Sequence, residues 1–390
     1  MIYWILHKKL TISDWKNEIE GNPCYFYEKI PNLCFIDIST YTLFAKVENF
    51  LLGVNKENDI SEFGISTERY IKIPSLKVLK NLLKSTNESD LFVFQSLADI
   101  RTKSLASILN GFCRQIALLN HWKPPIANPI PMKRNLNFIK IVLKKNPKLL
   151  FLRLLFRIYK FAEKKNLRIN YLLSGGNKLT EQIKKDFLVE NVVPVHSISY
   201  DEYLKVNKTV QESLIKEKYF VFVDQAITIH PDNKGFSEED SLLYQKEILN
   251  SLELISNQNE NIKIVIAEHP RIQYEKDFWK NYARFAGKTA ALIKYSAGVI
   301  GHFSTVLVLA QIYQKKIYLL KSSSLYFPFN ARVENAGKIL NSIIIDMKSN
   351  QIVSEVGCKE NWLVTDYFTL LPESEKQNSI LFMEFFRQYF

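Results

Sequence analysis

Glycine, cysteine and long apolar runs are all scarce in this chain, and each shortage removes a class of protein. Only 12 of 390 residues are glycine, and no low-complexity segment stands out, so the chain is expected to be globular. Its four cysteines lack CxxC or metal spacing, which favours reduced thiols in a cytosolic protein. The first apolar run, Ile2–Leu6, is too short for a signal peptide. The sequence contains no run of about 18 apolar residues, so a membrane-spanning helix is not predicted.

Short apolar runs alternate with stretches of helical period, the pattern of α/β units with parallel strands. A chain of 390 residues is too long for one ordinary core. We therefore predict two Rossmann-like α/β domains, over residues 1–205 and 217–371. A C-terminal helix over 372–390 is expected to pack back across the first domain or, alternatively, on its own second domain.

The apolar runs predict individual strands, and the stretches between them predict helices. The predicted strands are Ile2–Leu6, Cys34–Ile38, Leu91–Phe94, Ile169–Leu173, Val192–Val195, Tyr219–Val223, Ile262–Ala267, Ala297–Ile300 and Ile317–Leu320. The predicted helices include Leu76–Lys84, Ser104–Leu119, Tyr200–Lys216, Ser237–Asn257 and Thr305–Gln314.

Polar side chains follow three predicted strands of the second half, where open α/β sheets bind ligands. Asp224 and Gln225 end the strand YFVFV, and His230 and Asp232 follow closely. A carboxylate at this edge is a candidate general base, because partial burial raises its pKa. The alternative is that Asp224 caps the next turn.

The other two clusters suit a phosphate. Glu268, His269, Pro270 and Arg271 follow the strand IKIVIA, and an arginine can bind a phosphate through two hydrogen bonds while a histidine donates a third. The stretch Gly298–Thr305 precedes a predicted apolar helix and contains His302, Ser304 and Thr305. A Ser/Thr N-cap and the free N–H groups of a helix start predict an anion site there. Both turns would meet at one crevice.

A His-Pro strand end followed about 35 residues later by a Ser-Thr turn resembles the bacterial sialyltransferases, Kdo transferases and CDP-glycerol glycerophosphotransferases, over roughly residues 218–320. The resemblance implies a GT-B-like arrangement, with two domains facing each other across a cleft. It also implies that His269, Ser304 and Thr305 hold the phosphate and nucleotide of a cytidine-linked donor. Some sialyltransferases carry an acidic motif of two acids followed by a glycine. This chain has Asp224-Gln225-Ala226 in its place and so lacks the second acid and the glycine.

The first half offers weaker candidates for binding the acceptor. Ser174 and Gly175 follow the strand INYLL, where an ordinary turn is the alternative. His196 follows the strand VVPV, and Asp201 either binds the acceptor or stabilises the first turn of a helix.

Positive charge is concentrated in one segment. Residues 133–168 hold twelve Lys or Arg and one acid, Glu163, a net of +11 out of +12 for the whole chain. Within it Arg153, Arg157, Lys160 and Lys164 recur at helical spacing as a stripe on an otherwise apolar helix, which suits an anionic membrane surface. The alternative is a core helix with one solvated face. No aromatic platform or groove-reading motif accompanies the charge, so nucleic acid is not expected.

These patterns predict a glycosyltransferase at the inner face of the cytoplasmic membrane that moves a sugar from a nucleotide donor to a membrane-anchored glycan, such as lipopolysaccharide or capsule. An inverting displacement is expected, without a metal because no DxD motif is present, and without a further cofactor. The alternatives are a CDP-polyol phosphotransferase of the teichoic-acid type and a non-catalytic nucleotide-binding scaffold.

Overall fold

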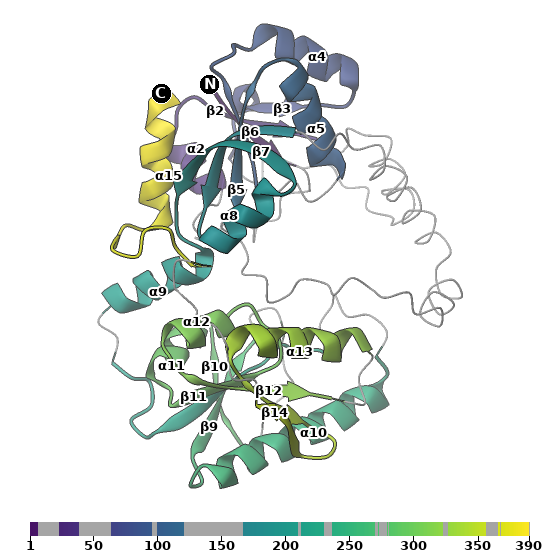
Figure 1. The fold of residues 1–390 in the computed structure, drawn as a ribbon, viewed down its shortest axis with the longest axis vertical. Helices are drawn as coiled ribbons and strands as arrows, with labels where there is room; N and C mark the ends of the chain where they lie inside the picture. The colour runs from purple at the N-terminus through teal and green to yellow at the C-terminus, as the bar shows by residue number, and fades with distance from the viewer. Residues whose placement is uncertain are drawn as a thin grey trace. The chain divides into compact units, whose positions relative to one another are not determined.

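The computed structural model describes residues 1–6, 23–38, 64–95, 100–120, 167–209, 212–229, 236–269, 272, 279, 281–322, 327–355, 366 and 368–389. These residues form two compact units (Figure 1). The first comprises the described residues up to Ile198 together with those after Thr365, and the second lies within Ser199–Val364.

A sheet of seven parallel strands forms the centre of the first unit, in the order β3-β2-β1-β4-β5-β6-β7. This order starts in the middle and reverses direction after β3, as in Rossmann folds. The strands are β1 (Ile2–Leu6), β2 (Leu33–Asp37), β3 (Tyr70–Lys72), β4 (Leu91–Phe94), β5 (Gln115–Asn120), β6 (Leu167–Ser174) and β7 (Phe187–Pro194).

Helices cover both faces of this sheet because alternate residues of each strand point to opposite sides. Ile2 and Trp4 of β1 pack on one face with α2 (Pro23–Lys29) and α15 (Asn378–Phe386), which lie side by side in Figure 1. The intervening residue Tyr3 packs on the other face with α4 (Leu76–Ser85) and α5 (Ile100–Gly111). The described residues of this unit also form α8 (Asn177–Lys184) and the short 3-10 turns Thr67–Arg69 and Arg387–Tyr389.

The second unit repeats the same topology with the order β10-β9-β8-β11-β12-β13-β14, all neighbours parallel except the edge strand β14. Its strands are β8 (Tyr219–Val223), β9 (Lys263–Glu268), β10 (Ala283–Ala286), β11 (Gly298–Gly301), β12 (Lys316–Lys321), β13 (Ile343–Asp346) and β14 (Gln351–Glu355). Its helices are α9 (Ile198–Lys208), α10 (Glu238–Gln258), α11 (Thr289–Tyr295), α12 (Leu307–Ile312) and α13 (Phe327–Leu340). The prediction of two Rossmann-like α/β domains is thereby confirmed.

The division between the units falls before α9, whereas the sequence placed it near residues 205–217. The ring of Tyr203 packs on Tyr313 at 5.0 Å, and Lys294 donates to the carbonyl of Val206 at 3.0 Å. These contacts attach α9 to the second unit. The helix also ends at Lys208, short of the predicted Lys216.

The C-terminal segment belongs to the first unit, the first of the two packing modes expected for it. Phe382 and Phe386 of α15 are fully buried and contact the ring of Phe26. Upstream, the side chain of Asn378 bonds both backbone polar groups of His196, at 2.8 and 2.9 Å. This segment is therefore part of the first unit's core.

Candidate functional site

The ends of β8 and β11 meet at the point where the strand order of the second sheet reverses. The two strands pair in parallel, with Phe222 opposite Ile300. Asp224 and Gln225 follow β8, and His302, Phe303 and Ser304 follow β11. In sheets of this kind, ligands bind in the crevice at this reversal, outside the carboxyl ends of the strands.

A hydrogen bond joins the two loops at the reversal. The side-chain oxygen Oε1 of Gln225 accepts the main-chain N–H of Phe303 at 2.8 Å. Gln225 and Phe303 are both half-buried, so this bond is partly shielded from water. It fixes the position of the loop that carries Ser304 and Thr305.

Asp224 closes a tight turn at the same place. Its Oδ1 accepts the N–H of Ala226 at 2.7 Å, and only 4% of the residue is exposed. Ala226 has a φ of +47°, in the left-handed region that favours glycine. The turn after β8 therefore holds an alanine in a conformation that a glycine would adopt more readily.

His302, predicted to contact the donor, instead lies inside the second unit. The residue is fully buried. Its Nδ1 bonds the carbonyl of Leu320 at 2.7 Å, and its Nε2 bonds the hydroxyl of Tyr244 at 2.7 Å. Because a carbonyl only accepts, the proton sits on Nδ1, and Nε2 accepts from tyrosine. Burial lowers the pKa of His302 to about 4, so the ring is neutral and serves to hold the loop.

The turn Ser304-Thr305 does not cap α12 as predicted. The helix begins at Leu307, its N-cap is Val306, and no side chain caps it. The Ser304 hydroxyl accepts from the N–H of Val306 at 3.4 Å, a long and weak bond. Among the described residues, no group accepts a hydrogen bond from the N–H of Ser304 or of Thr305. Two successive half-buried residues thus keep donors available for a ligand.

The second predicted cluster is divided by the structure. Glu268 forms an ion pair with Arg284 on the edge strand β10, with oxygen and nitrogen 2.6 Å apart, so it joins two strands rather than contacting a donor. The carbonyl of His269 accepts the N–H of Ile272 at 3.2 Å, and this histidine is half-buried. Pro270 and Arg271 lie outside the described residues.

Candidates in the first half have structural roles where the structure describes them. His196, proposed for the acceptor, is fully buried, with its ring nitrogens on the Thr369 hydroxyl at 2.6 Å and the Lys376 carbonyl at 2.9 Å. Burial lowers its pKa to about 4. It therefore secures the C-terminal segment rather than contacting an acceptor.

The other acceptor candidates are also buried. A Cβ added at Gly175 would lie 2.5 Å from the nitrogen of Ser197, so this glycine allows two backbones to approach closely. Ser174 ends β6, and Asp201 sits in the first turn of α9, 3% exposed. These positions support packing and helix stabilisation.

One residue at this edge was missed by the sequence analysis. Arg332 on α13 is exposed and places its guanidinium 5.4 Å from the centre of the Phe303 ring. On the same helix, Phe329 packs against His302 and Phe303 at 5.2 and 5.3 Å. Arg332 follows Ser304 by 28 positions without a motif, so only the tertiary fold brings the two together.

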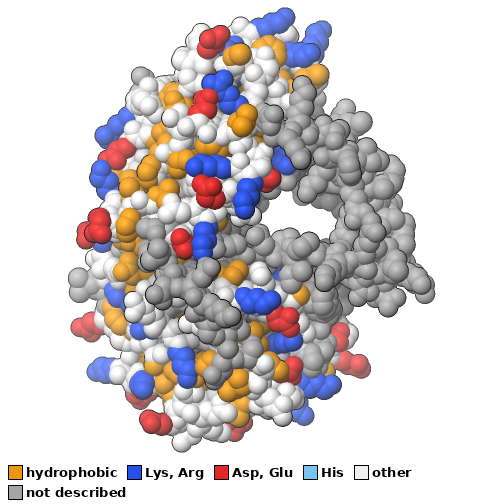
Figure 2. Space-filling view, viewed as in Figure 1, with side chains coloured by type: hydrophobic (Ala, Val, Ile, Leu, Met, Phe, Trp, Pro, Cys, Tyr) orange, Lys and Arg blue, Asp and Glu red, His pale blue; other side chains and the backbone are white. Residues whose placement is uncertain are grey.

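Several predicted residues lie outside the described part of the chain. They are His230, Asp232, Arg153, Arg157, Lys160 and Lys164. On the face shown in Figure 2, the described surface carries interspersed positive and negative side chains. Within the described ranges, no three His, Cys, Asp or Glu residues are grouped to hold a metal, and no helix is long and apolar enough to cross a membrane.

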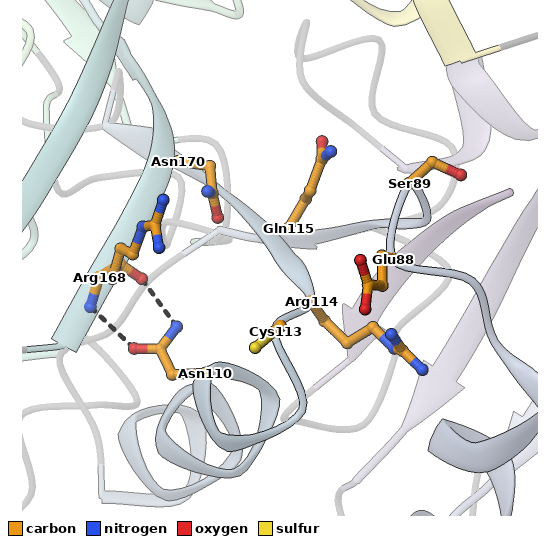
Figure 3. A pocket seen from close by; sticks show the side chains of 8 residues that line it. All are labelled: Glu88, Ser89, Asn110, Cys113, Arg114, Gln115, Arg168 and Asn170. Carbon is orange, nitrogen blue, oxygen red and sulfur yellow. Dashed lines mark hydrogen bonds between the residues drawn. The ribbon is translucent and has the colours of Figure 1, made fainter.

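Two cavities lie at the opposite edges of the sheets. One, of about 400 Å³, lies at the amino ends of β5 and β6 and is drawn in Figure 3. Its arginines already have partners: Arg114 donates to the carbonyls of Leu83 and Thr86, and Arg168 pairs with Glu190. The other, of about 440 Å³, lies between α10 and the starts of β9 and β10. Neither adjoins the strand ends discussed above.

No protein-family model matches the chain, and no curated protein matches it. Among solved structures, it is similar to the UDP-GlcNAc 2-epimerase from Methanocaldococcus jannaschii, with 14% identity, coverage of 99% of this chain and 100% of that one, and a TM-score of 0.43. It is also similar to the spinosyn forosaminyltransferase SpnP (11% identity, 89% and 85% covered, TM-score 0.36). A third is the wall teichoic acid polymerase TagF (12% identity, 82% and 69% covered, TM-score 0.34). The low identity and TM-scores mean that none of these likenesses assigns a role to a residue of this chain.

Proposed function

We propose that the second unit binds the phosphate of a nucleotide donor at the carboxyl ends of β8 and β11, and that the protein is a nucleotide-sugar-dependent glycosyltransferase. The observation that carries the proposal is the pair of unused N–H donors of Ser304 and Thr305 at the strand-order reversal. The bond from Phe303 to Gln225 and the buried ring of His302 hold these donors in place.

Donors at this edge suit the chemistry of transfer. When the bond between sugar and phosphate breaks, negative charge grows on the leaving nucleotide, and fixed N–H and hydroxyl groups stabilise it. In the proposal Ser304, Thr305 and His269 bind the phosphate. Asp224 accepts the proton of the attacking acceptor hydroxyl, with His230 or Asp232 as alternatives in the loop after β8. The displacement is inverting and uses no metal.

The donor and acceptor follow from the resemblance in sequence. The order of the His-Pro and Ser-Thr turns supports a cytidine-linked donor carrying a sialic-acid-like or Kdo-like sugar. The acceptor is a surface glycan held at the inner membrane face, approached through the basic segment 133–168. The alternative is a CDP-polyol donor, from which a polyol phosphate is transferred. The product distinguishes the two donors, because the acceptor gains either a sugar or a polyol phosphate.

Calorimetric titration with CMP, CDP, UDP and GDP tests the proposal. Wild-type protein is expected to bind a cytidine nucleotide. His269→Ala, and Ser304→Ala combined with Thr305→Ala, are each expected to weaken that binding while the far-UV circular dichroism spectrum is unchanged. Wild-type protein that binds none of the four nucleotides would remove the enzyme proposal.

A further inference from the structure

Arg332 is a cation at the carboxyl edge of the second sheet and has no acidic partner among the described residues. Its guanidinium lies 5.4 Å from the centre of the Phe303 ring, and it forms no ion pair with a residue that the structure describes. Glu334, two positions along α13, is already paired with Lys321 at 2.5 Å. In the described part of this edge, the charge of Arg332 is thus not neutralised by an acid, and it lies against Phe303, the residue before the Ser304-Thr305 turn.

The contact with Phe303 also sets where the guanidinium lies. A cation over an aromatic face is attracted by the ring's negative charge distribution, which restrains an otherwise flexible side chain. Phe303 is itself held by its N–H bond to Gln225 and by the ring of Phe329. The charge is thus placed beside the residue that immediately precedes the unused donors.

We propose that Arg332 completes an anion site with Ser304 and Thr305 and binds the phosphate of the donor, the part that the sequence had given to Arg271. This inference rests on the proposed function for the identity of the nucleotide, but the anion site itself does not. A guanidinium presents a planar fork of donors that matches two phosphate oxygens, and the turn supplies N–H and hydroxyl donors to the others.

Inorganic pyrophosphate and CDP, titrated separately by calorimetry, test the assignment. Arg332→Gln is expected to weaken binding of both by about 10- to 100-fold, the cost of losing a charge-assisted hydrogen-bond pair. Arg332→Lys keeps the charge but loses the planar fork of donors. Its affinity for both ligands is expected to lie between that of wild type and that of Arg332→Gln. Lys338→Gln removes one exposed charge from the same helix and is expected to bind as wild type does.

The outcomes separate the two proposals. If Arg332→Gln and Lys338→Gln bind pyrophosphate equally, or if wild type does not bind it, the Arg332 assignment is wrong even when CDP still binds. If pyrophosphate binding depends on Arg332 but no nucleotide binds, the anion site stands and the nucleotide-sugar function fails. Unchanged melting temperatures of the variants show that a loss of binding is not a loss of fold.

Discussion

The side chain of Gln225 accepts the main-chain N–H of Phe303 at 2.8 Å and thereby joins the loops that follow β8 and β11. The two residues are 78 positions apart in the chain. Because this bond lies where the strand order reverses, it ties the proposed base loop to the proposed phosphate loop. Both loops depend on it for their relative position.

Replacing Gln225 separates its structural and binding roles. Gln225→Leu leaves the Phe303 N–H without an acceptor and is expected to lower the free energy of unfolding by about 1–3 kcal/mol and to weaken nucleotide binding. Gln225→Glu keeps an accepting oxygen, so stability is retained, but its charge repels a phosphate and binding still falls. Urea unfolding and calorimetry measure the two effects. A Leu variant as stable as wild type would show that the bond does not hold the loop.

Asp224→Asn tests the general base with little disturbance of structure. The Asn side chain keeps an oxygen that accepts the N–H of Ala226, so the turn after β8 is preserved. Transfer is expected to be nearly abolished while donor affinity is kept, because a base acts on the acceptor in the transition state. Steady-state turnover within a few-fold of wild type would pass the role to His230 or Asp232.

The buried His302 predicts a defined pH dependence of stability. Its folded pKa of about 4 lies below the ordinary 6.5, so the unfolded chain takes up a proton first as pH falls. The contribution is fully present above pH 6.5 and is lost between pH 6.5 and 4. From pH 7 to 5 the loss is about 2 kcal/mol.

His302→Asn supplies the comparison, since it removes this titration while His196 still titrates in both proteins. Denaturant unfolding at pH 7 and pH 5 is expected to show a smaller drop for the variant. The variant is less stable at both pH values because the bonds to Tyr244 and Leu320 are altered. Equal drops for the two proteins would mean that the pKa of His302 is the same in the folded and the unfolded chain.

The strand pattern of the sequence predicted the sheets well where strands are fully apolar. β1, β4 and β8 have the predicted ends, because strands buried on both faces read as continuous apolar runs. The predicted helix Ser104–Leu119 is wrong in its second half: α5 ends at Gly111, Cys113 takes a φ of +54°, and Gln115–Asn120 form β5. A helical period and a short apolar strand are hard to distinguish there.

The candidate site was predicted at the level of strand ends but not of individual contacts. Asp224 follows β8 and Ser304 follows β11, as expected. The positions of the apolar runs in the sequence are enough to place both residues at strand ends. The bonds of His302 to Tyr244 and of Glu268 to Arg284 join residues distant in the chain. Burial and pairing of this kind depend on tertiary packing, which local patterns do not contain.

The basic segment 133–168 is expected to bring the protein to an anionic membrane. Each Lys or Arg at such a surface contributes about 1 kcal/mol, and the attraction is screened within about 8–10 Å at physiological ionic strength. Wild-type protein should sediment with anionic vesicles at low salt and less as salt rises. A variant with Arg153, Arg157, Lys160 and Lys164 changed to Gln should not sediment.

A second variant controls for charge alone. Lys77, Lys80 and Lys84 on α4 and Lys338 on α13 are exposed, and changing these four to Gln removes the same charge elsewhere. This variant is expected to sediment as wild type does. Equal sedimentation of all three proteins would show that the stripe is a solvated helix face without a membrane role.

A crystal structure of the protein with bound CDP would locate the phosphate directly. We expect phosphate oxygens within about 2.7–3.1 Å of the Ser304 and Thr305 main-chain nitrogens, at the carboxyl ends of β8 and β11. A nucleotide bound instead at the first sheet, or in the cavity at the amino ends of β5 and β6, would contradict this expectation.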